Sequence, residues 1–153
     1  MKHRNLAASI AVTAIASLVA VPVAHAAPAP QLTKTTVTNN CSWNGYNHRG
    51  TASLSVTYSY DTRNKVLRLE SWRINNRGQY WVNGKWILIP NAAYLITAGS
   101  NITAAGKTSS TGVASGAPNI ILSQSTRTVG ARLQSPAGSG VCGTSVNPPS
   151  AWK

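Results

Sequence analysis

Acid–base chemistry in this chain is limited to very few side chains. After position 26 the only histidine, aspartate and glutamate are His48, Asp61 and Glu70. Most hydrolytic mechanisms need two positioned groups that exchange a proton, and a glycosidase would have to use both carboxylates. Asp61 falls in a predicted turn, where it normally caps the backbone, and Glu70 lies between Arg68 and Arg73, which favours a salt bridge. We therefore expect structural roles for both acids and assign no catalytic residue.

One enzymatic alternative remains open. A histidine, a glutamate and an arginine form the kind of set that a cyclising ribonuclease uses, and a basic protein suits an RNA substrate. Here that set would be His48, Glu70 and one arginine, and it requires the three to meet in one cleft. The sequence contains no Gly-x-Ser-x-Gly motif that would present a serine nucleophile. After position 26 the only possible base for such a serine is again His48.

The first 26 residues read as an export signal. Lys2, His3 and Arg4 precede an apolar run at 6–23, and Ala24-His25-Ala26 supplies the small-x-small cleavage pattern. A membrane anchor is the alternative, because about 18 apolar residues nearly span a bilayer. Serine, threonine and proline interrupt this run, which favours the cleaved signal. We expect a secreted, extracellular protein with no membrane insertion after cleavage.

The charge balance is strongly basic. The 153 residues contain 14 lysines and arginines against two acids, a formal net charge of +12. Lys2 and Arg4 leave with the signal, which lowers the net charge to +10. Such a charge attracts anionic polymers, although it also keeps a secreted protein soluble without any specific partner.

The two cysteines, Cys41 and Cys142, predict a disulfide. An even pair in an oxidising compartment most often forms one bond, which here would join the two ends of the domain. A catalytic thiol would need a free sulfur beside a histidine. A metal site is poorly supported by one histidine and two distant thiols, so we assign no metal and no cofactor.

The hydrophobic pattern predicts an all-β protein. Apolar and polar residues alternate over 51–60, which indicates a strand with one buried and one exposed face. Asn83-Gly84 favours a tight type I′ hairpin turn. The alternation changes parity within 65–74, so we expect a bulge or a strand covered on both faces. We expect an antiparallel β-sandwich, immunoglobulin-like or jelly-roll-like, with about seven or eight strands.

The expected boundaries follow from turn residues and composition. Residues 1–26 form the signal, 27–30 a proline-rich linker, 31–147 one domain and 148–153 a C-terminal tail. Within the domain we expect strands at 31–38, 51–60, 65–74, 79–89, 91–98, 119–134 and 141–146, a loop at 39–50, turns at 61–64 and 75–78, and a break at 135–140. The segment 99–118 is small and polar, and it reads either as a long mobile loop or as a pair of strands.

The clearest candidate for a function is a basic and aromatic stretch in the middle of the chain. Cations beside aromatic rings attract polyanions and stack on sugars or bases. The predicted ligand-binding residues are Arg63, Lys65, Arg68, Arg73, Arg77, Trp81 and Lys85. Trp72 and Trp86 are more typical of a core in a protein without phenylalanine. Tyr80 and Trp81 should face opposite sides of one strand.

Two other features have two interpretations each. Trp43 and Tyr46, close to Cys41, either cover the disulfide or meet a ligand. Arg127 and Arg132 either extend the basic surface or protect an edge strand from pairing.

These features predict a non-catalytic secreted protein that binds an anionic or glycan surface, such as a cell envelope, a polysaccharide or a nucleic acid. The alternative is a secreted inhibitor, toxin or antagonist that acts on a secreted or cell-surface protein through 99–118. A ribonuclease-like enzyme is the third hypothesis.

Overall fold

The computed structural model describes residues 31–89, 91–134 and 141–152, so the expected signal, the linker and the break at 135–140 lie outside the described residues. The described part is built of strands, and it contains no helix long and apolar enough to cross a membrane. The strands are β1 (Leu32–Asn44), β2 (His48–Asp61), β3 (Val66–Asn76), β4 (Gln79–Val82), β5 (Lys85–Leu88), β6 (Ala93–Ala98), β7 (Asn101–Lys107), β8 (Val113–Gly116), β9 (Ile120–Leu122), β10 (Val129–Gln134) and β11 (Val141–Val146).

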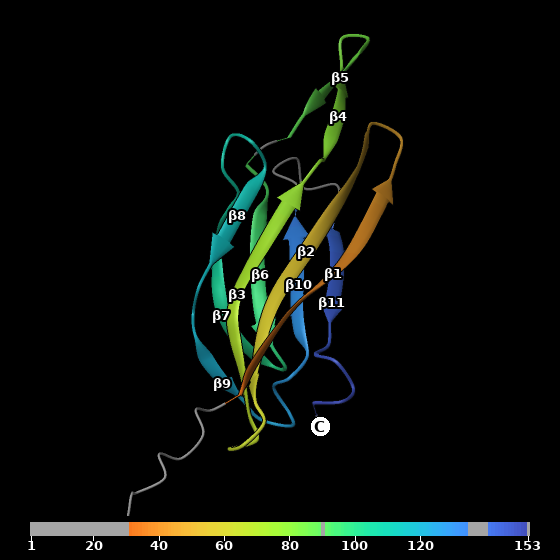
Figure 1. The fold of residues 1–153 in the computed structure, drawn as a ribbon. Coiled ribbons are helices and arrows are strands. Elements are labelled where there is room, and N and C mark those ends of the chain that lie inside the picture. The colour runs from red at the N-terminus through yellow and green to blue at the C-terminus, as the bar shows by residue number, and fades with distance from the viewer. Residues whose placement is uncertain (1–30, 90, 135–140, 153) are drawn as a thin grey trace, which may run out of the picture.

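Two antiparallel sheets pack face to face as a β-sandwich, which confirms the predicted fold class (Figure 1). The larger sheet has β2 and β3 at its centre, with β1, β4, β5, β8 and β9 around them. The smaller sheet has the order β11-β10-β6-β7. The described residues form eleven strands, so the expected seven or eight was too low.

The observed strands differ from the expected ones where a composition rich in turn residues led to a wrong prediction. The expected loop at 39–50 is wrong, because β1 continues to Asn44 and pairs residue by residue with β2, which leaves only 45–47 as a turn. The segment 99–118 forms β7 and β8, which belong to different sheets, and 119–134 divides in the same way into β9 and β10. Cross-strand pairing overrides local composition in each case.

The core follows the alternation that the sequence predicted. Leu54, Val56 and Tyr58 of β2 are fully buried between the sheets. In β3 the register shifts opposite Thr57 and Tyr58, so that Glu70 has no partner residue in β2. This bulge confirms one of the two explanations for the parity change, because it lets leucines before it and Trp72 after it face the same core.

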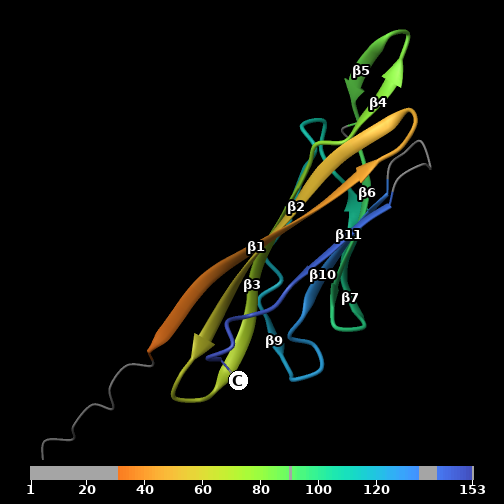
Figure 2. The same cartoon turned by 90° about the vertical axis from the view of Figure 1, so that its right-hand side faces the viewer.

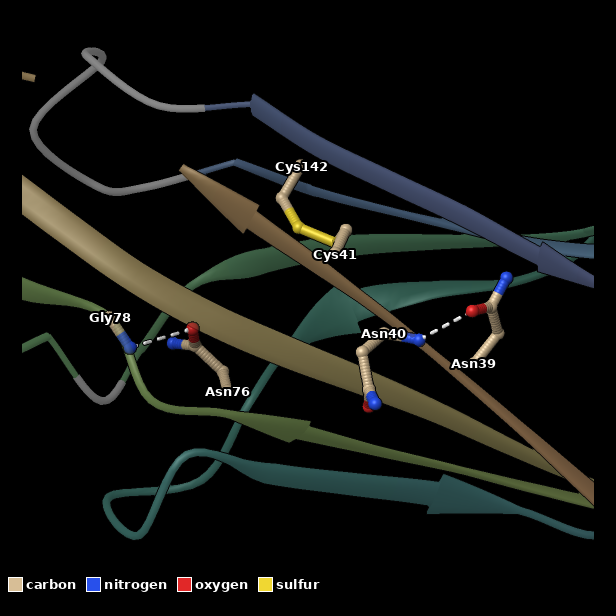
Figure 3. The surroundings of a disulfide bond; sticks show 6 residues. All are labelled: Asn39, Asn40, Cys41, Asn76, Gly78 and Cys142. Atoms are coloured by element: carbon tan, nitrogen blue, oxygen red, sulfur yellow. Dashed lines mark hydrogen bonds between the residues drawn. A yellow bond between two sulfur atoms is a disulfide. The ribbon is translucent and has the colours of Figure 1, made fainter. Parts of the chain in front are cut away.

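The predicted disulfide is present and joins the two sheets. Cys41 of β1 and Cys142 of β11 have Cα atoms 5.9 Å apart and are 101 residues apart in sequence (Figure 3). Asn39 adds a second link nearby, because its Nδ2 donates to the carbonyl oxygen of Ser145 at 3.0 Å. The first and last strands are thereby held against each other.

One hairpin extends past the body of the sandwich. β4 and β5 reach beyond the ends of the other strands (Figures 1 and 2). Only Tyr80 and Gln79 pair with β2, while the rest of the hairpin pairs with itself. Asn83 and Gly84 both have positive φ, at 49° and 78°, as the predicted turn requires. The hairpin therefore exposes side chains that a sandwich strand would bury.

Candidate functional site

The side of the larger sheet that faces away from the core carries most of the polar side chains. Alternate residues of β2 from Arg49 to Ser59 point to this side, because Leu54 and Val56 between them are buried. We call this side the outer face. It is lined by the outward residues of β1, β2 and β3 and continues onto the hairpin.

The register places three of the predicted binding residues on the outer face. Arg73 pairs with Ser55 and Arg68 pairs with Ser59, and the bulge at Glu70 keeps both arginines on the same side. Gln79 pairs with Arg49, and Trp81 lies two residues further along β4 on that same side.

Arg49, which was not among the predicted binding residues, lies at the junction of the larger sheet and the hairpin. The Cζ atom of Arg49 lies 4.1 Å from the centre of the Trp86 ring. Trp86 in turn packs edge-on against Trp81, with ring centres 5.2 Å apart. Gln79 holds the guanidinium, because its Oε1 accepts from Arg49 Nε at 3.1 Å. A fixed cation thus lies beside two aromatic rings, one of which, Trp81, is 45% exposed.

A groove of about 400 Å³ adjoins this cluster. It is lined by two arginines, two amides, a hydroxyl, an indole and a glycine: Arg49, Arg77, Asn44, Gln79, Thr51, Trp43 and Gly50. Gly50 and Gly78 lie against the Trp43 ring, where an added Cβ would come within 2.7 Å of it. Only glycine permits this close approach. The Trp43 ring therefore packs closely on these two glycines, and it also contacts the core.

Hydroxyl groups extend from the groove along the outer face. Thr36 and Thr57 have their Oγ1 atoms 2.9 Å apart, and Thr38 Oγ1 lies 2.8 Å from Ser55 Oγ. These pairs form ordered rows on neighbouring strands. Rows of groups that both donate and accept hydrogen bonds suit a polar chain lying on the sheet.

Both acidic side chains of the chain are described, and both lie away from the groove. Asp61 ends β2, and Glu70 contacts Ser59 near that same end, about 30 Å along the strand from Arg49. Glu70 forms the expected salt bridge, but its partner is Lys34 at 3.1 Å and not Arg68 or Arg73. Hydrogen bonds from Ser59 and Lys34 hold the pKa of Glu70 below its ordinary value. The groove end is therefore left cationic.

Asp61 has the predicted turn role. Its Oδ1 accepts from the backbone amides of Arg63 and Asn64 at 2.9 and 3.1 Å, and its Oδ2 accepts from Asn64 Nδ2 at 2.7 Å. Hydrogen bonds from Asn64, above all from its backbone amide, lower the pKa of Asp61. This carboxylate is thus occupied by its own turn.

The seven predicted binding residues do not form one patch. Lys85 pairs with Val82 and points to the other side of the hairpin from Trp81. Arg77 lines the groove, while Arg63 and Lys65 lie in the turn between β2 and β3 at the opposite end of the sheet. Arg49 was missed because 39–50 read as a loop, although its place two residues before the alternating 51–60 run was a usable signal.

The tryptophans divide between core and surface. Trp72 is a core residue with 4% exposure and packs against Tyr94, as the absence of phenylalanine predicted. Trp86 instead lies on the hairpin under Arg49. Trp43 and Cys142 line a common small cavity, so the indole packs beside the disulfide, whereas Tyr46 is fully exposed in its turn.

The residues of the ribonuclease hypothesis do not meet. His48 begins β2 and contacts Asn47, while Glu70 lies near the other end of that strand. Within the ranges that the structure describes, no three His, Cys, Asp or Glu side chains are grouped as metal ligands.

No family model, curated protein or solved structure matches this chain.

Proposed function

We propose that this protein is secreted and binds an anionic polymer whose repeating units contain a ring, without catalysing a reaction on it. An anionic polysaccharide, such as a component of a cell envelope, is the favoured ligand. The observation that carries the proposal is the placement of Arg49 over Trp86, beside a groove that also holds Arg77.

The charge distribution supports this choice. Both carboxylates are about 30 Å from the groove along β2, and each already has hydrogen-bond donors of its own. The cations at the groove end have no acidic neighbour to neutralise them. A polyanion would be attracted to that end first.

The aromatic and hydroxyl groups support a polymer with rings. The exposed face of Trp81 can stack on a sugar, and the edge-on contact with Trp86 holds that face in place. The threonine and serine rows then offer hydrogen bonds further along the outer face. These groups favour a polysaccharide over a nucleic acid, because sugar hydroxyls both donate and accept.

Salt dependence tests the proposal. The protein should be retained on a heparin column and pass through uncharged dextran, and its affinity should fall roughly 50-fold between 50 and 200 mM salt if about four cations take part. A DNA column tests the alternative that the ligand is a nucleic acid. Retention on heparin that is unchanged between 50 and 500 mM salt contradicts the proposal, and tighter binding to DNA contradicts the choice of polysaccharide.

The protein-effector alternative has less support than the polymer proposal. It relied on 99–118 as a long flexible segment, but this segment forms β7 and β8 joined by a hydrogen-bonded turn at 108–112. Ser109 holds that turn through the backbone amides of Thr111 and Val113.

A further inference from the structure

A second concave site lies at the opposite end of the sandwich from the groove. It is a cleft of about 300 Å³ between the turn that follows β2, the segment between β9 and β10, and the C-terminal segment. Its lining residues combine two cations, two rings, two leucines and two polar side chains: Lys65, Arg127, Tyr60, Trp152, Leu67, Leu122, Ser123 and Gln124. We call it the Arg127 cleft.

Arg127 is incompletely bonded in this cleft. Its Nε is buried and has no hydrogen-bond partner. One terminal nitrogen, Nη2, donates to the carbonyl oxygen of Trp152 at 3.5 Å, which is the limit for a hydrogen bond. A charged donor without a good acceptor is costly, and the long Nη2 contact leaves the terminal nitrogens of Arg127, rather than the buried Nε, to donate to a ligand in the cleft.

No acidic side chain lines the Arg127 cleft, although both acids of the chain are described. Asp61 is close in sequence to Lys65, but the amides of its own turn and Asn64 occupy its oxygens. Glu70 is paired with Lys34. Among the described residues, Lys65 and Arg127 therefore face one cleft with no acidic side chain between them.

The walls of the cleft are apolar and aromatic. Tyr60 and Trp152 stack nearly parallel, with ring centres 5.7 Å apart and 13° between their planes. Leu67 and Leu122 are 4% and 6% exposed and close the inner side. The volume is at the lower end of the range for small-molecule sites, which suits a ligand with a single ring.

We propose that the Arg127 cleft binds a single-ring organic molecule that carries a phosphate or sulfate group. Arg127 and Lys65 hold the oxyanion, because a guanidinium matches the geometry of two such oxygens and an ammonium adds charge. The ring lies against Trp152 and the leucines, and Ser123 and Gln124 supply polar contacts. This site is separate from the polymer site of the proposed function and does not depend on it.

The test follows indole N–H signals by NMR while phenyl phosphate is added to the protein. The five tryptophans give separate signals, which single Trp→Phe variants assign. The Trp152 signal should shift saturably, while those of Trp81 and Trp86 stay in place. Phenyl sulfate is compared with phenyl phosphate to distinguish the two oxyanions. Phenol tests the ring alone and inorganic phosphate tests the charge alone, and each should bind at least tenfold more weakly than phenyl phosphate.

Two variants locate the oxyanion. Arg127→Gln should weaken phenyl phosphate binding by tenfold or more. Lys65→Asn should weaken it several-fold with the fold intact, because Lys65 is exposed and has a φ of 53°, which asparagine tolerates. Arg132→Gln, on the other sheet, is the matched control and should change nothing.

Three results overturn the proposal. They are a Trp152 signal that responds equally to phenol, wild-type affinity for phenyl phosphate in both the Arg127 and the Lys65 variants, and loss of that affinity in an Arg49→Gln variant. The last result would place the ligand in the groove instead. Failure of heparin binding would leave this cleft unaffected, so the two proposals fail separately.

Discussion

The guanidinium of Arg49 lies 4.1 Å from the centre of the Trp86 ring and joins two parts of the molecule. Arg49 belongs to the central strand β2, while Trp86 belongs to the hairpin that extends past the sandwich. The contact helps to hold the hairpin in line with the outer face. It also keeps a positive charge at the mouth of the groove.

Removing the two groove arginines should weaken polymer binding more than removing the same charge elsewhere. Arg49→Gln with Arg77→Gln should lower heparin affinity about tenfold at 50 mM salt and reduce the salt slope by about 2. Isothermal titration calorimetry over a salt series measures both. Arg132→Gln with Lys107→Gln removes equal charge from the smaller sheet, and an equal loss of affinity in that variant would show that only net charge matters.

Trp81 should contribute to affinity and hardly to stability. Trp81→Ala is expected to lower heparin affinity about tenfold, since an aromatic platform contributes about 1–3 kcal/mol per stacked ring. Its free energy of unfolding should fall by less than about 1 kcal/mol, because the ring is 45% exposed. Ile102→Ala, at an exposed apolar position of β7, is the control for loss of surface area.

Trp72 should show the opposite behaviour. It is 4% exposed and packs against Tyr94, so Trp72→Ala leaves a cavity between the sheets. The expected loss is about 3–5 kcal/mol in the free energy of unfolding, measured by urea denaturation. A loss below about 1 kcal/mol would contradict its place in the core.

The disulfide should provide much of the stability. Replacing both Cys41 and Cys142 by alanine releases a loop with a sequence separation of 101, and the chain-entropy account then predicts a loss of about 4–5 kcal/mol. Urea denaturation of this variant, and of the wild type with a reductant, should give the same lowered midpoint. An unchanged midpoint in both would show that the bond does not constrain the unfolded chain.

Glu70 should make stability depend on pH in the acidic range. Its pKa is lower in the folded protein than its ordinary value of 4.5, so the folded state binds its proton less readily than the unfolded state. Its stabilising effect is therefore complete above about pH 4.5 and is lost as the pH falls through the lowered value. The melting temperature of Glu70→Gln should be below that of the wild type at pH 6, and the two should converge toward pH 2.5. A gap that stays constant over this range would rule out the carboxylate as its cause.

Local patterns in the sequence were sufficient for several elements. The alternation over 51–60 predicted the central strand, and Asn83-Gly84 predicted the hairpin turn, because both depend on neighbouring residues alone. Asp61 was correctly expected to cap its turn for the same reason. The cysteine pair was predictable because only two cysteines exist to form a bond.

Tertiary structure alone decided which distant residues meet. The partner of Glu70 is Lys34, 36 residues away, and its choice depends on the register between β1 and β2. The same register carried β1 on to Asn44 through residues that favour turns. Strand pairing depends on the packing of the whole core, so a short stretch of sequence does not contain the information that fixes the register.

The candidate site shows both sides of this division. The sequence by itself determined that cations and tryptophans are concentrated in the middle of the chain while carboxylates are scarce. Only the fold could divide those cations between the groove and the Arg127 cleft, and bring Arg49 onto Trp86 from 37 residues away. The type and number of side chains are properties of the sequence. Which of them come together in one site depends on strand register and on the bulge that turns Arg68 and Arg73 to one face.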